Sequence, residues 1–206
     1  MGFSAFEKNK IAELEMNPWI TEIHTKAFAH NFIRKLTIPS EVTWISDKAF
    51  AENLLKSLTF LPGKTLLIGR GAFKTNYLSE LKLHNRVRGI SEEAFADNQL
   101  ESLVVPYQVT HIKKDAFRKN LLTTIRVKGP TELDDGAFFE NPSLKTVKLH
   151  TLMGYSAFDK YRVIWEITFS FSYIRVYGKC DRIRDLGPRD RFECKNYVDL
   201  EWNKFR

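Results

Sequence analysis

The sequence predicts a repeat solenoid of the α/β type, in which each coil of about 22 residues contributes one short parallel strand. Three features recur in order: an Ala-Phe pair, an Asn three residues after the Phe, and a short strand pattern. The pair occurs at Ala5-Phe6, Ala27-Phe28, Ala49-Phe50, Ala72-Phe73, Ala94-Phe95, Ala116-Phe117, Ala137-Phe138 and Ala157-Phe158, in steps of 22, 22, 23, 22, 22, 21 and 20 residues. Self-similarity at such a period is typical of stacked repeats.

The Asn position is the most regular polar feature of the repeat. It is filled by Asn9, Asn31, Asn53, Asn76, Asn98, Asn120 and Asn141, and only Tyr161 breaks the series. A buried amide without partners costs about 1–3 kcal/mol. We therefore expect these side chains to bond the backbone of the turn and of neighbouring coils, as a structural ladder along the stack.

A strand pattern follows each Asn, as in Leu100-x-x-Leu103-x-Val105. Its last positions alternate inward and outward, as in a half-buried strand. The other copies start at Ile33, Leu55, Leu78, Leu122 and Leu144, and a degenerate first copy starts at Ile11. The strands are expected to stack into one parallel sheet along the solenoid. The Ala-Phe half is too short for a full helix, so it predicts a helical turn or an irregular arc.

The first copy of the repeat begins without a capping segment. An apolar residue stands five positions before each Phe, and for Phe6 this position is Met1. An uncapped coil exposes apolar surface and strand edges. We therefore expect the chain to be part of a longer protein, and self-association through the N-terminal coil is a further expectation.

The repeat resembles the BspA-like class of leucine-rich repeats. The resemblance rests on stretches such as Val42-Thr43-x-Ile45-x4-Ala49-Phe50-x-x-Asn53-x-Leu55-x-x-Leu58, and it covers residues 1 to about 158. The chain departs from the family pattern by using Asn rather than Cys in the ladder. The resemblance implies a right-handed solenoid in a cell-surface or secreted bacterial protein that binds host or matrix components, without identifying the ligand.

Residues 159–206 leave the repeat and form a second unit after the solenoid of residues 1–158. Alternating apolar residues predict one strand from Val163 to Tyr173 and another from Phe192 to Trp202. A small β cap over the C-terminal coil is the favoured interpretation, and a separate small binding module is the alternative. Cys180 and Cys194 form one disulfide or remain two thiols; the sequence does not decide between them.

Composition sets few limits on function. The chain of 206 residues carries a net charge of +7 with a pI near 9.3, which permits acidic partners without selecting one. No run of 18 apolar residues predicts a membrane-spanning helix, so no membrane insertion is expected. Residues 1–10 lack the features of a signal peptide, so the expected surface or secreted location follows from the resemblance alone.

Catalytic and cofactor motifs have no support in the sequence. Pro62-Gly63-Lys64-Thr65 lacks the first Gly of a phosphate-binding loop, because Leu58 occupies that position. The histidines show no metal-binding spacing, and neither Cys lies in a nucleophile motif. We expect no enzyme activity, no catalytic or metal-binding residues and no cofactor.

The outward positions of the strands are the candidate binding surface. Near the ends of the strands, the first three coils are acidic to neutral, whereas later coils carry the candidate ligand-binding residues Lys82, His84, Arg126, Lys128, Lys148 and His150. The alternative is an ordinary solvated face. Aromatic residues for nucleic-acid stacking are missing from these positions, so nucleic acid is an unlikely ligand. The sequence thus favours a non-enzymatic recognition or adhesion module for a protein or anionic glycan, with a structural or assembly role as the second hypothesis.

Overall fold

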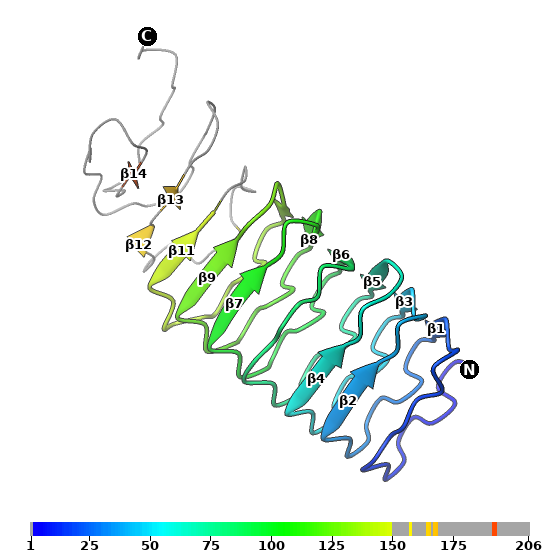
Figure 1. Ribbon diagram of the computed structural model, residues 1–206. Helices are drawn as coiled ribbons and strands as arrows, with labels where there is room; N and C mark the ends of the chain where they lie inside the picture. The colour runs from blue at the N-terminus through cyan, green and yellow to red at the C-terminus, as the bar shows by residue number, and fades with distance from the viewer. Residues whose placement is uncertain (1, 150–156, 158–163, 166, 169–190, 193–206) are drawn as a thin grey trace.

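The computed structural model describes residues 2–149, 157, 164–165, 167–168 and 191–192, and shows a row of stacked coils (Figure 1). The repeat solenoid predicted from the sequence is confirmed, and no helix forms in this part of the chain. Coils are numbered here by the Phe they contain, from Phe6 in coil 1 to Phe138 in coil 7.

Five of the predicted repeat strands, joined by Ile164–Trp165 from the strand predicted at Val163 to Tyr173, form one face of the solenoid, called here the strand face. Its strands are β2 (Lys35–Ile38), β4 (Ser57–Phe60), β7 (Ser102–Val105), β9 (Thr124–Val127), β11 (Thr146–Lys148) and β12 (Ile164–Trp165). Neighbouring strands pair in parallel, with β2 on β4 and β7 on β9 on β11 on β12. Residues 11–16 and 78–83 form no strand, so the row begins at coil 2 and is interrupted at coil 4.

A second parallel sheet, which the sequence did not predict, runs along the solenoid. Its strands are β1 (Glu22–Ile23), β3 (Trp44–Ile45), β5 (Leu66–Ile68), β6 (Val87–Ile90), β8 (His111–Ile112) and β10 (Glu132–Leu133), paired in this order. Each contains the apolar residue that stands five positions before a Phe. Most of these strands are two residues long, too short for an alternating pattern to reveal them.

Between the two sheets lies a core of stacked rings. Phe6, Phe28, Phe50, Phe73, Phe95, Phe117 and Phe138 stack in sequence, with ring centroids 5.2 to 5.6 Å apart. The rings from Phe28 to Phe138 are buried, whereas Phe6 at the end of the stack is 41% exposed. Each buried ring contributes about 1.5–3 kcal/mol, but only because the neighbouring coils cover it.

The Asn side chains join consecutive coils next to this stack. Asn98 donates to the carbonyls of Phe95 at 3.2 Å and of Phe73 in the preceding coil at 3.0 Å. Its Oδ1 accepts the N–H of Leu78, also in the preceding coil, at 3.1 Å. Asn31, Asn53, Asn76, Asn120 and Asn141 make the equivalent bonds and are buried. Asn9 differs, since it is exposed and, among the described residues, bonds only the carbonyl of Glu7.

The Ala-Phe half of each coil is a tight turn. The residue before the Ala and the residue before the Asn both have positive φ, for example Lys26 at 54° and His30 at 56° in coil 2. Two such residues keep the chain from continuing into a helix. The N–H groups of Lys26, Phe28 and His30 each donate to a carbonyl of coil 3 at 2.9 Å, so every turn is bonded to the next.

The expected C-terminal β unit lies mostly outside the described residues. Within it, β13 (Ile167–Thr168) pairs antiparallel with β14 (Arg191–Phe192). The division at residue 158 therefore stays a prediction, and Cys180 and Cys194 lie outside the described residues.

Candidate ligand-binding surface

The strand face of coils 6 and 7 brings three of the predicted binding residues together. Arg126 on β9 and Lys148 on β11 are register partners in adjacent strands, which lie about 4.8 Å apart. Lys128 follows β9 directly and its N–H bonds the carbonyl of Val105 in coil 5. Arg126, Lys128 and Lys148 are called the basic patch below.

The other predicted residues lie apart from the basic patch. Lys82 and His84 belong to coil 4, and coil 5 separates them from Arg126 with Val104 and Pro106 at the corresponding positions. The Nδ1 atom of His84 accepts the N–H of Arg86 at 3.2 Å, so this ring stabilises a local turn. His150 lies outside the described residues.

The charge of the strand face differs in one respect from the expectation of acidic to neutral early coils. Arg34, Lys35 and Lys56 are exposed on coils 2 and 3. The two outward positions compared in the sequence lie near the end of each strand. Arg34, Lys35 and Lys56 lie earlier, before the second core residue of their strands. The early coils thus carry basic groups as well.

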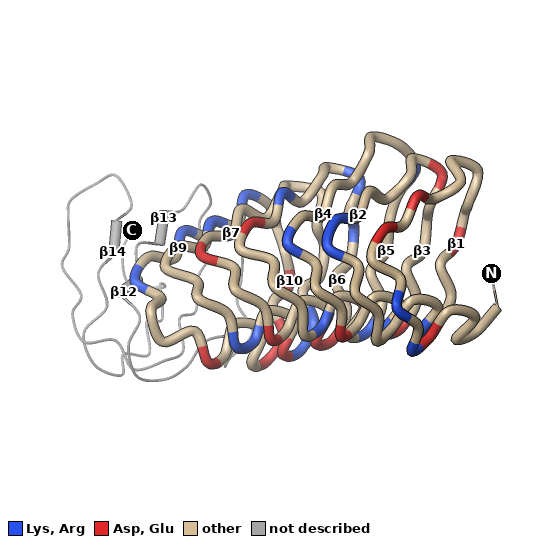
Figure 2. Tube along the Cα trace, turned by 90° about the horizontal axis from the view of Figure 1, so that it is seen from below, with Lys and Arg blue, Asp and Glu red and all other residues tan. Residues whose placement is uncertain are grey.

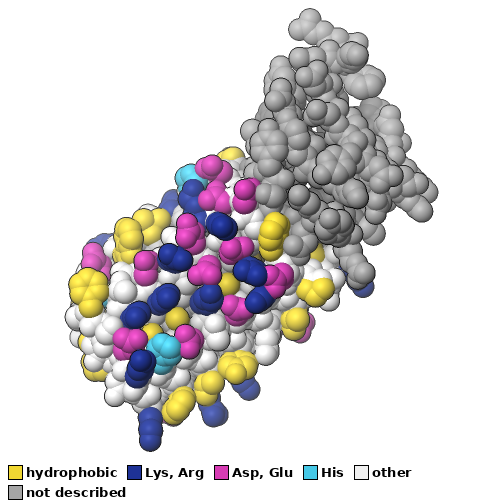
Figure 3. All heavy atoms as spheres, turned by 180° about the vertical axis from the view of Figure 1, so that it is seen from behind, with side chains coloured by type: hydrophobic (Ala, Val, Ile, Leu, Met, Phe, Trp, Pro, Cys, Tyr) yellow, Lys and Arg dark blue, Asp and Glu magenta, His cyan; other side chains and the backbone are white. Residues whose placement is uncertain are grey.

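Charged residues on the turns neutralise one another between coils. Lys26 pairs with Glu7, Lys74 with Glu93 at 2.8 Å, Lys113 with Asp134, and Arg118 with Glu140. Basic and acidic segments alternate along the lower edge of Figure 2, and both kinds of side chain mix on the face shown in Figure 3. By contrast, Arg126 and Lys128 are exposed and form no ion pair with the described residues.

Four ionisable groups on the solenoid, Glu7, Arg86, Glu93 and Arg118, have shifted pKa values, and two of them, Glu93 and Arg86, matter below. The hydrogen bond from Lys74 is the main cause that lowers the pKa of Glu93. Burial lowers the pKa of Arg86, whose guanidinium nevertheless stays charged near neutral pH. Neither group lies in the basic patch.

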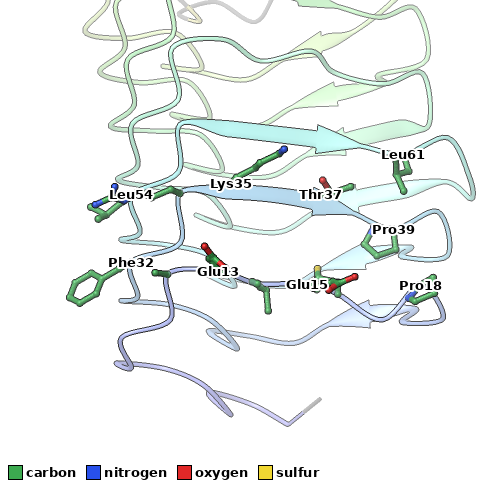
Figure 4. A pocket seen from close by; sticks show the side chains of 13 residues that line it. Glu13, Glu15, Pro18, Phe32, Lys35, Thr37, Pro39, Leu54 and Leu61 are labelled. Atoms are coloured by element: carbon green, nitrogen blue, oxygen red, sulfur yellow. The ribbon is translucent and has the colours of Figure 1, made fainter.

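A groove of about 1040 Å³, which the sequence did not predict, lies on the strand face of coils 1 to 3. Apolar side chains, among them Met16, Phe32 and Leu61, line it together with Glu13 and Lys35 (Figure 4). Glu13 and Lys35 occupy the same position in adjacent coils yet form no ion pair within the described structure. The sequence signal for this groove is the apolar residue directly after the Asn, such as Phe32 or Leu54.

The rejected phosphate-loop motif has a structural role. A Cβ at Gly63 would lie 2.2 Å from the carbonyl oxygen of Ser40, so this glycine allows coil 3 to approach coil 2. Lys64 pairs with Glu41 at 2.8 Å. The loop therefore packs against the preceding coil.

Among the described residues, no group of three or more His, Cys, Asp or Glu side chains could hold a metal ion. His30 lies between Glu7 and Glu52 and His111 pairs with Glu132, all contacts between coils, and His111 also bonds its chain neighbour Thr110. No helix in this part of the protein could cross a bilayer.

Comparison with known proteins agrees with the repeat architecture. The family model described as a BspA type leucine rich repeat region matches six copies over residues 1–81 and 67–180. The match thus extends beyond residue 158. Comparison with curated proteins and with solved structures finds no match. Because the family model covers most of the sequence, the chain belongs to the BspA-type leucine-rich repeat family.

Proposed function

We propose that this chain is a non-enzymatic recognition or adhesion module that binds an anionic ligand, a protein or a glycan, through the basic patch. Family membership suggests a repeat protein for protein–protein interaction or adhesion, and such families are typically non-enzymatic. The observation that carries the proposal is the adjacency of Arg126 and Lys148 on paired strands, with Lys128 beside them. We further propose that the chain is part of a surface or secreted bacterial protein.

Electrostatics supports this choice of surface. Many charged side chains on the turns form ion pairs with one another. By contrast, exposed Arg126 and Lys128 have no carboxylate partner among the described residues. Cations without partners on a rigid sheet can bind an anion without first breaking an internal ion pair. Complementary charge also speeds the encounter with a ligand.

Charge reversal tests the proposal. In a variant with Arg126→Glu, Lys128→Glu and Lys148→Glu, capture on glycan and protein arrays should fall at least about tenfold, because like charges facing each other cost several kcal/mol. The melting temperature should change little, since outward surface substitutions usually alter stability by at most about 0.5 kcal/mol. Undiminished capture by this variant would show that the basic patch is not the binding site.

An assembly role is the second candidate, and the N-terminal coil favours it. One face of the Phe6 ring stacks on Phe28, and the ring is 41% exposed. Asn9 lacks the bonds to a preceding coil that Asn31 makes. Sedimentation of the chain over a range of concentrations tests this role: a larger species that grows with concentration supports it, and a monomer throughout removes it.

A further inference from the structure

Next to the basic patch, the strand face carries a row of hydroxyl groups. Ser102 on β7, Thr124 on β9 and Thr146 on β11 are register partners across three parallel strands. Two residues further along the same strands come Val104, Arg126 and Lys148. Residues i and i+2 of a strand point to the same face, so hydroxyls and cations share one surface.

The hydroxyls of this row are available to a ligand. Within the described structure, those of Ser102, Thr124 and Thr146 take part in no hydrogen bond. The neighbouring hydroxyl of Thr123 differs, since it donates to the carbonyl of Glu101 at 3.0 Å. The chain therefore offers, one residue apart, one hydroxyl that serves the fold and one that does not.

Strand geometry sets the spacing of these donors. Equivalent side chains on adjacent strands stand about 4.8 Å apart, and the hydroxyl and cation rows about 6.6 Å apart along the strand. A sulfate group presents three terminal oxygens, so it can accept from a cation and from a hydroxyl at the same time. Repeated sulfates on a linear polymer could therefore use both rows on several coils.

The same surface is poorly suited to the other anionic ligands. Its outward positions on β7, β9 and β11 contain one Arg and no aromatic residue, whereas protein interfaces usually centre on Trp and Tyr as well as Arg, and single-stranded nucleic acid binds stacking rings. Val104, 46% exposed, is the largest apolar side chain at these positions. Polar donors thus dominate the surface.

We propose that the ligand of the basic patch is a linear sulfated glycan, held by Arg126, Lys128 and Lys148 and by the hydroxyls of Ser102, Thr124 and Thr146. This inference rests on the proposed function and specifies its ligand. The cations supply most of the affinity, and the hydroxyl row distinguishes a sulfated glycan from other polyanions.

Binding of three probes to hydroxyl variants tests the inference. The probes are a heparin decasaccharide, polyglutamate and a single-stranded oligo-dT, each titrated by fluorescence anisotropy. Thr124→Val with Thr146→Val removes two hydroxyls and keeps every charge. This variant should bind the heparin probe about threefold to tenfold more weakly, the range for one or two modest hydrogen bonds, and polyglutamate as well as before. Thr123→Val is the matched control, which should lower the melting temperature slightly and leave heparin binding unchanged.

A second pair of variants separates this inference from the proposed function. Arg126→Gln, Lys128→Gln and Lys148→Gln together should abolish binding of every probe. The control variant makes the same charge change on the turns and should still bind the probes; it combines Lys26→Gln, Lys114→Gln and Lys119→Gln. If polyglutamate or oligo-dT binds as tightly as heparin, or if the hydroxyl variant binds heparin normally, the glycan inference is overturned and the proposed function stands. If the basic-patch variant and the turn variant bind heparin equally well, both the glycan inference and the proposed function are overturned.

Discussion

Asn98 shows how a single side chain completes two coils at once. Its amide donates to carbonyls of its own coil and of coil 4, and its Oδ1 accepts the N–H of Leu78. Those backbone groups belong to buried residues, so they cannot form hydrogen bonds with solvent instead. The side chain therefore replaces backbone pairing where the chain turns between the Phe and the strand.

Replacing Asn98 by Ala should destabilise the protein by about 1–3 kcal/mol, since the buried N–H of Leu78 loses its acceptor. The carbonyls of Phe73 and Phe95 each lose one of two amide donors. Chemical unfolding followed by circular dichroism measures this change. Asn9→Ala is the matched control at the same repeat position, and it should cost less than about 0.5 kcal/mol because Asn9 is exposed. Similar losses in the two variants would contradict the ladder as a source of stability.

At the scale of an element, Arg86 organises the turns that link the two sheets. Its side chain is 4% exposed, and its Nη atoms donate to the carbonyls of Pro39, Ser40, Val42 and Lys64, at 2.8 to 3.2 Å. These carbonyls belong to coils 2 and 3, so one guanidinium holds the turns of three consecutive coils. Its Nε has no partner in the described structure.

Arg86→Met should loosen these turns and lower stability by about 2 kcal/mol. The carbonyls of Val42 and Lys64 lose the guanidinium donor, and those of Pro39 and Ser40 keep only a backbone N–H. Hydrogen exchange should become faster in residues 39–42 and 61–65, where mass spectrometry can follow it. Arg88→Met is the control, since Arg88 makes only two contacts of 3.4 Å to carbonyls. Unchanged exchange in both segments would show that the turns do not depend on Arg86.

The role of Arg86 could not be predicted from the sequence, because its carbonyl partners lie up to 47 residues away. The interruption of the strand row at coil 4 could not be predicted either, since residues 78–83 keep the apolar spacing of their neighbours and still form no strand. The Phe and Asn positions could be predicted because they repeat. For the candidate surface, the sequence correctly orders Arg126 and Lys148 on adjacent strands, whereas the groove beside Phe32 combines side chains of three coils, whose packing the sequence does not give.

At the scale of the whole molecule, ion pairs between turns join neighbouring coils along the stack. The pair of Lys74 and Glu93 joins coil 4 to coil 5 and lowers the pKa of Glu93 below its ordinary value of 4.5. A lowered carboxyl pKa means that the folded state holds this proton less tightly than the unfolded state. The stabilisation is therefore complete above about pH 4.5 and is lost as the pH falls through the lowered folded-state pKa.

Glu93→Gln should thus reduce the free energy of unfolding at neutral pH, and its difference from the unmodified chain should shrink below about pH 4.5. Urea unfolding at a series of pH values gives this difference directly. Glu92→Gln is the control, since Glu92 pairs with Arg70 only at 3.7 Å and both side chains are exposed. A difference that stays constant down to about pH 2 would exclude the pair as its cause.

The direction of the Asn hydrogen bonds matches the order in which the coils are synthesised. Each Asn from Asn31 to Asn141 reaches back to the coil before it, so a coil obtains its last hydrogen bonds from its successor. A ribosome delivers the coils in that same order. Growth from the N-terminus therefore leaves only the newest coil unfinished, and every coil that emerges closes the one already folded.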